Sequence, residues 1–139
     1  MEQAGRNETI LIWILRTGGA LTVLAFPTAL LPATWMAGVH EWLGLGVFPD
    51  QPITGYLARS LSLLYGVHGV LLLVIATDVR RYRTLIGWLA WLMVVLGPAF
   101  LLVDLHSGMP SFWTWTEGPP LVVVGIVALY LRRSVPVER

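Results

Sequence analysis

The sequence predicts an all-α membrane protein, an antiparallel bundle of four transmembrane helices with short interfacial helical segments on the outer side. Three observations favour this fold class. Hydrophobic residues make up 56% of the 139 residues and charged residues only 12%, whereas an average soluble domain has about 25% charged residues. The apolar residues gather in four long runs, and arginines crowd into alternate connections between the runs. Because too little polar surface remains for a water-soluble particle, we expect lipid to cover the helices.

The four apolar runs predict the helix positions within a single domain, residues 1–139. A transmembrane helix needs roughly 20 residues, and the first three runs have this length. The fourth run, from Pro119 to Leu131, is shorter, so we expect it to recruit flanking residues, with the two prolines in its first turn. We expect the first run to stay uncleaved, because it is long for a signal peptide and contains Arg16. The predicted helices lie at about residues 10–31, 53–77, 84–103 and 117–133.

Arginine placement predicts the orientation. The connection between the second and third runs contains three arginines, and others lie in the leader and the tail. The two remaining connections, at about residues 31–52 and 104–118, contain neither arginine nor lysine. The positive-inside rule therefore predicts a multi-pass protein of the cell membrane with both termini in the cytoplasm. The flanking arginines are Arg6, Arg80, Arg81, Arg83, Arg132, Arg133 and Arg139.

Three features of the chain are also found in a known group of membrane proteins. They are the number of helices, the placement of the arginines, and outer connections rich in tryptophan and proline, such as Trp35, Pro49, Pro110 and Trp113. Over most of its length the chain resembles small bacterial four-helix inner-membrane proteins, which include DoxX-like and several uncharacterised families. This resemblance implies an association with quinone-linked or redox partners in the membrane. It assigns no functional residue, because no specific motif is shared.

Composition excludes several functions. The net charge of about +1 argues against nucleic acid as a partner, since nucleic-acid-binding proteins carry a broad basic surface. The absence of cysteine excludes a disulfide framework, a thiolate metal site and a cysteine nucleophile. No motif for ATP or dinucleotide binding is present.

Arg59 is the most informative polar residue within the apolar runs. It recurs at helical spacing with Ser62, Gly66 and Gly69, and small residues in such a row let a second helix approach closely. We therefore expect Arg59 to point into the bundle, where a buried charge needs a partner. One interpretation is a structural ion pair, and the other is a polar pocket for a substrate, lipid headgroup or quinone. The candidate partners on the outer side are Asp104, Glu117 and Glu41.

Two further polar residues lie inside apolar runs. Arg16 is expected to extend to the headgroups or to pair with Asp78. His68 falls near the middle of the second run, where a hydrogen bond to a neighbouring helix is the simplest role. A proton relay or a haem ligand is the alternative, although no second histidine lies at the same depth.

The outer connections also contain residue types that bind divalent metals. His40, His106 and Glu117, with Glu41 and Asp104, supply imidazoles and carboxylates of the kind that zinc prefers. They are scattered over three segments, and no paired-histidine motif marks a metal site. Polar edges of interfacial helices are the alternative explanation.

These features favour a non-enzymatic accessory or interaction subunit, with the lipid bilayer, other membrane proteins or further copies of itself as partners. An outer pocket would hold a lipid or a quinone. The alternative function is a redox or metal-dependent enzyme subunit with its site on the outer face; no particular cofactor is indicated. A third function, an oligomeric transporter or channel, requires self-association because four short-looped helices line a path poorly.

Overall fold

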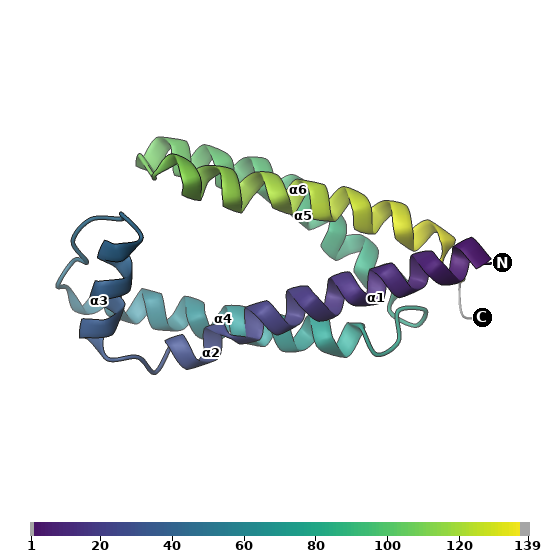
Figure 1. Ribbon diagram of the computed structural model, residues 1–139, viewed down its shortest axis with the longest axis horizontal. Coiled ribbons are helices and arrows are strands. Elements are labelled where there is room, and N and C mark those ends of the chain that lie inside the picture. The colour runs from purple at the N-terminus through teal and green to yellow at the C-terminus, as the bar shows by residue number, and fades with distance from the viewer. Residues whose placement is uncertain (1, 137–139) are drawn as a thin grey trace. The chain divides into compact units, whose positions relative to one another are not determined.

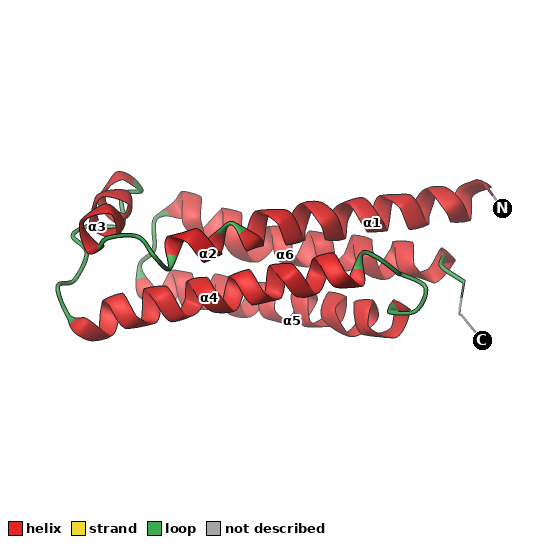
Figure 2. Ribbon diagram, turned by 90° about the horizontal axis from the view of Figure 1, so that it is seen from below, coloured by secondary structure: helices red, strands yellow, loops and turns green. Residues whose placement is uncertain are grey.

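The computed structural model describes residues 2–136 and confirms the predicted all-α class (Figures 1 and 2). No strand occurs in this range, and four helical segments are long and apolar enough to cross a membrane. These segments are residues 2–28, 52–75, 83–107 and 111–134. The helices are α1 (Glu2–Val23), α2 (Ala25–Thr28), α3 (Ala33–Trp42), α4 (Pro52–Ile75), α5 (Arg83–Ser107) and α6 (Ser111–Leu131), followed by the 3₁₀ turn η1 (Arg132–Ser134).

The chain divides into two compact units, which are described separately. Unit 2 is the continuous stretch Leu15–Val74, with the second half of α1, then α2, α3 and most of α4. Unit 1 joins Met1–Ile14 to Ile75–Arg139 and therefore holds the first half of α1 together with α5 and α6. Helix α1 contributes to both.

In unit 2, the predicted small-residue face of α4 packs against α1 and α2 in antiparallel register. A Cβ atom added at Gly69 would lie 2.7 Å from the carbonyl oxygen of Gly19, and one at Gly66 would meet the ring of Phe26. Further toward the start of α4, the hydroxyl of Thr28 donates a hydrogen bond to Ser62 at 3.0 Å. Glycine at these positions lets the helices touch through their backbones, which is how membrane helices associate without a hydrophobic driving force between them.

In unit 1, α5 and α6 form a second antiparallel pair, and they lie side by side in both views (Figures 1 and 2). The closest approach joins Gly97 to Gly118, where an added Cβ atom at Gly118 would lie 2.6 Å from the carbonyl oxygen of Gly97. Gly125 fits in the same way against the carbonyl of Ala90. Gly118 and Gly125, about two turns apart on α6, therefore fix the α5–α6 register.

The buried apolar residues of unit 1 concentrate where α1 and α5 begin and α6 ends. Leu11, Ile75 and Ile86 are almost fully buried. Two polar contacts tie the same ends: the side-chain amide of Asn7 donates to the hydroxyl of Ser134 at 3.0 Å, and Arg80 forms a salt bridge to Glu8 at 2.9 Å. Other buried members of this core are Ala76, Val79, Ala90, Ala128, Leu131 and Val135.

The first predicted helix, residues 10–31, is wrong at both ends. Helix α1 begins at Glu2 because contacts within unit 1 hold the polar leader: Asn7 binds Ser134 and Glu8 binds Arg80. It ends at Val23 because Pro27 has no N–H to donate to the Val23 carbonyl. The chain then continues as α2.

The predicted start of the fourth helix, residue 117, lies later in the chain than the start found in the structure. Helix α6 begins at Ser111, and Pro119 and Pro120 lie inside it rather than in its first turn. The prolines remove two hydrogen-bond donors, but α6 continues through them beside the close contact of Gly118 with α5. The short apolar run is therefore the second part of a full-length helix.

The second and third predicted helices, 53–77 and 84–103, agree with α4 and with most of α5. Helix α5 extends four residues beyond the prediction to Ser107, and the next residue, Gly108, has a φ of +69° in the left-handed region. The backbone N–H of Met109 then donates to the Asp104 carbonyl at 3.0 Å, which closes the helix.

Helix α3 lies in the connection between the first two candidate spans, where the sequence predicts an interfacial helix. None of its residues is buried. Its apolar residues Trp35, Val39 and Trp42 recur at helical spacing, and all three are exposed. An amphipathic helix with this face suits the membrane–water interface.

We predict that Gly97→Ala destabilises the α5–α6 pair. The new methyl group would overlap the side chain of Val122 and lie 2.7 Å from the Gly118 carbonyl oxygen, and overpacking of this kind costs about 1–3 kcal/mol. Thermal unfolding in mild detergent measures the change. Gly38→Ala in α3, where an added Cβ atom meets nothing within 4 Å, is the matched control and should unfold at or above the wild-type temperature. Equal melting of the two variants would contradict the close α5–α6 contact.

Candidate functional site

Arg59 binds a backbone carbonyl within unit 2. Its guanidinium donates to the carbonyl oxygen of Leu31 at 3.1 Å, just beyond α2. Arginine commonly satisfies the last carbonyls of a helix in this way. Glu41, one predicted counter-ion, is exposed and forms no salt bridge with Arg59. The predicted pairs with Asp104 and Glu117, which belong to unit 1, stay predictions.

Asp104 is the unusual carboxylate of unit 1. It is 5% exposed, and its Oδ2 atom has no hydrogen-bond partner within residues 2–136. Thr114, which is also buried, donates its hydroxyl to the Pro110 carbonyl at 3.3 Å. A buried polar atom without a partner lowers stability, so Asp104 is a destabilising position near the C-terminal end of α5.

The proposed metal ligands are occupied by local contacts or exposed. Glu117 accepts a hydrogen bond from the indole N–H of Trp113 at 2.7 Å. His40 lies 2.9 Å from the Gly46 carbonyl through Nδ1, and this nitrogen must carry the proton because a carbonyl only accepts. His106 is exposed at the end of α5. Across the described residues, no three histidine, aspartate or glutamate side chains are placed to hold a metal ion, so the metal hypothesis gains no support.

The two intramembrane polar residues are both exposed. Arg16 is exposed on α1, and its extension to the headgroups stays a prediction. Its alternative partner Asp78 accepts a hydrogen bond from the backbone N–H of Arg81 at 3.0 Å, and the Arg16–Asp78 pair stays a prediction. For His68 on α4, no hydrogen bond to a neighbouring helix is found in residues 2–136.

A different arrangement emerges where α5 begins and α6 ends. Arg83 donates through Nε to the carbonyl oxygen of Arg132 at 3.1 Å, and Arg132 donates through NH1 to the carbonyl oxygen of Arg83 at 3.3 Å. This reciprocal contact, the arginine clasp, brings two guanidinium groups to one place. The salt bridge found among residues 2–136 joins Arg80 to Glu8, and no carboxylate there pairs with either arginine of the clasp.

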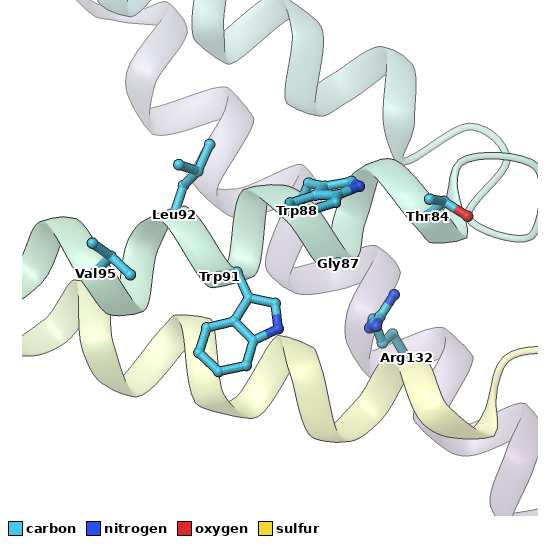
Figure 3. A pocket seen from close by; sticks show the side chains of 7 residues that line it. All are labelled: Thr84, Gly87, Trp88, Trp91, Leu92, Val95 and Arg132. Carbon is cyan, nitrogen blue, oxygen red and sulfur yellow. The ribbon is translucent and has the colours of Figure 1, made fainter.

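The side chain of Arg132 lies against the backbone of α5 because residue 87 is glycine. A Cβ atom added at Gly87 would collide with the guanidinium, and Figure 3 shows Arg132 reaching from α6 toward this position. Arg132 is only partly exposed. Apart from the bond to Arg83, its N–H groups have no partner within the described residues.

An open-sided groove of about 570 Å³ extends from Arg132 along α5 (Figure 3). The lining residues of α5 recur every three or four positions and so share one face. Between the first and last of them the helix rises roughly 16 Å. Trp88 and Trp91 are 67% and 54% exposed, which is far from the burial expected of a core tryptophan. The lining is Thr84, Gly87, Trp88, Trp91, Leu92, Val95 and Arg132.

The groove combines an apolar wall with a charged end. Trp88, Trp91, Leu92 and Val95 offer carbon surface, whereas Arg132 and the hydroxyl of Thr84 offer hydrogen-bond donors. Such a site suits an amphiphile with an apolar tail and a polar head. No group in it is placed to act as a nucleophile activated by a neighbouring base, which nucleophilic catalysis requires.

Sequence reasoning missed this site. It treated Arg132 only as an arginine of the cytoplasmic flank, where arginine is typical, and Trp88 and Trp91 as members of the third apolar run. The spacing of Trp88, Trp91 and Val95 was visible, but the register that places Arg132 opposite Gly87 depends on glycine contacts along the whole α5–α6 pair.

Comparison of the chain with protein-family models, with curated protein sequences and with solved structures gave no significant match.

We predict that Asp104→Asn stabilises the protein. Asparagine has the shape of aspartate but removes an ionisable group that is 5% exposed and has an unpartnered oxygen, so the unfolding free energy should rise by about 1–2 kcal/mol. Thermal unfolding in mild detergent provides the measurement, with Asp50→Asn, at an exposed position, as the neutral control. A lower melting temperature for Asp104→Asn would contradict the inference that the buried carboxylate destabilises the protein.

Proposed function

We propose that the chain is a non-enzymatic accessory subunit of the cell membrane, with both ends in the cytoplasm, that holds a membrane amphiphile in the groove along α5. Of the alternatives left open by composition, this proposal keeps one site: we place the pocket for a lipid or quinone at the arginine-rich end of unit 1 and not among the residues of the outer connections.

The groove is the observation that carries this proposal. Two tryptophans with more than half of their surface exposed lie on one helix face and lead to a charged side chain held in place by Gly87. Tryptophan supplies large, rigid contact area to a binding site. The position of the groove along α5 also suits a membrane amphiphile. The lining begins in the first turn of α5 and extends along the candidate membrane span Arg83–Ser107.

The accessory role is supported by what the remaining polar side chains do. Asn7 and Glu8 tie α1 to the end of unit 1, Arg59 satisfies the carbonyl of Leu31, and Glu117 accepts from Trp113. These contacts stabilise helices and loops of the chain itself. A subunit of this kind acts through what it binds and where it places the bound molecule.

The proposed orientation is testable because the chain contains no cysteine. Glu2→Cys lies at the start of α1, and Val47→Cys replaces an exposed residue of the first outer connection. In intact cells, a membrane-impermeant thiol reagent should label Val47→Cys and should label Glu2→Cys only after permeabilisation. The reverse labelling pattern would invert the topology.

Amphiphile binding is testable by replacing both groove tryptophans. Trp88→Ala/Trp91→Ala removes most of the apolar wall, so retention of a bound lipid or quinone should fall about fivefold or more, equivalent to about 1 kcal/mol. Native mass spectrometry from mild detergent and analysis of co-purified lipid provide the measurement. Trp115→Ala is the matched control, because Trp115 is 66% exposed but lies outside the groove on α6. Equal loss in both variants would contradict binding at the groove.

A further inference from the structure

We infer that the occupant of the groove is an anionic phospholipid, whose phosphate binds at Arg132 and whose acyl chain follows the α5 face toward Val95. This inference rests on the proposed function and adds the chemical class of the ligand. The observation that carries it is the arginine clasp: Arg132 lines the head of an apolar groove, Arg83 contacts Arg132, and no carboxylate within residues 2–136 pairs with either arginine.

The two positive charges of the arginine clasp favour an anionic ligand over a neutral hydrogen-bond acceptor. Arg83 and Arg132 are each partly exposed at the end of helices that enter the candidate membrane spans. Charged groups near hydrocarbon are stabilised by pairing. A quinone offers only neutral carbonyl oxygens, whereas a phosphodiester offers a full negative charge and oxygens that a guanidinium can bind in pairs.

The position of Arg132 favours a bound headgroup over simple extension into water. An unconstrained arginine at the end of a membrane helix extends toward the aqueous phase. Arg132 instead folds back over Gly87 and donates to Arg83 with one N–H. Its other N–H groups have no partner among the described residues, and the hydroxyl of Thr84 lines the same end.

The lining explains why a free phosphate is not the expected occupant. Beyond the first turn of α5, the groove is formed by tryptophan and aliphatic side chains over roughly 16 Å. Only a ligand with a long apolar part covers this surface. Under the proposed topology, the clasp lies at the cytoplasmic leaflet, where anionic lipids attract clustered basic residues.

The test compares lipids that differ in headgroup charge but share the same acyl chains. The purified full-length protein is titrated with phosphatidylglycerol or phosphatidylcholine in mild detergent, and bound lipid is measured by native mass spectrometry. We expect wild type to prefer phosphatidylglycerol about tenfold or more, as charge-assisted hydrogen bonds imply.

Four variants separate charge from structure. Arg132→Gln should abolish the preference, and Arg132→Lys should restore part of it because the charge returns without the planar fork. Gly87→Ala keeps the charge but displaces the guanidinium, so it should lower the preference while the protein stays folded. Arg133→Gln, an exposed neighbour outside the groove lining, is the control and should retain the wild-type preference.

The outcomes distinguish this inference from the proposed function. Equal binding of the two lipids, still sensitive to Trp88→Ala/Trp91→Ala, would overturn the anionic class and leave the groove as a site for a neutral amphiphile. Lipid binding insensitive to both tryptophans would overturn the proposed function itself. Competition by millimolar inorganic phosphate with no requirement for the tryptophans would identify a phosphate site and overturn the phospholipid. If Arg133→Gln loses the preference for phosphatidylglycerol as fully as Arg132→Gln does, the preference comes from general surface charge, and the inference of a specific site at Arg132 is overturned.

Discussion

Close backbone contact at glycine is the constraint on which the rest of this structure depends. Lipid is as apolar as the helix surfaces, so helices in a membrane gain little from burying leucine against leucine and must rely on fit. Gly69 against Gly19 and Gly118 against Gly97 provide that fit, once in each unit. Each contact fixes a register, and the register decides which side chains of the two helices meet at their ends.

The groove of unit 1 is a consequence of such a register. Gly97 and Gly125 set α6 along α5 so that the end of α6 meets the start of α5. Arg132 then lies over Gly87, and Arg83 reaches the carbonyl of Arg132. A change of one residue in register would carry Arg132 about 100° around the helix and remove the charged end of the groove. The candidate site therefore depends on packing contacts more than a turn away from it.

Sequence reasoning captured what composition and periodicity control. The four candidate spans, the small-residue face of α4 and the helical segment α3 between the first two spans follow from runs and spacings that a single segment contains. The start of α1 and the start of α6 were missed, because polar leader residues and internal prolines become helical through contacts with other segments. The arginine clasp was missed for the same reason: residues 83 and 132 are distant in sequence, and each alone is typical of a cytoplasmic flank.

The sharing of α1 between the units has a consequence for the order of assembly. Unit 2 is one uninterrupted stretch, Leu15–Val74, so all of its parts exist before α5 and α6 have been synthesised. Unit 1 needs the first half of α1 and also the segment from Ile75 onward. Domains generally fold as units during synthesis from the N-terminus. The leader that carries Asn7 and Glu8 is therefore synthesised long before its partners Arg80 and Ser134, and the contacts that complete unit 1 form only after Ser134 has left the ribosome.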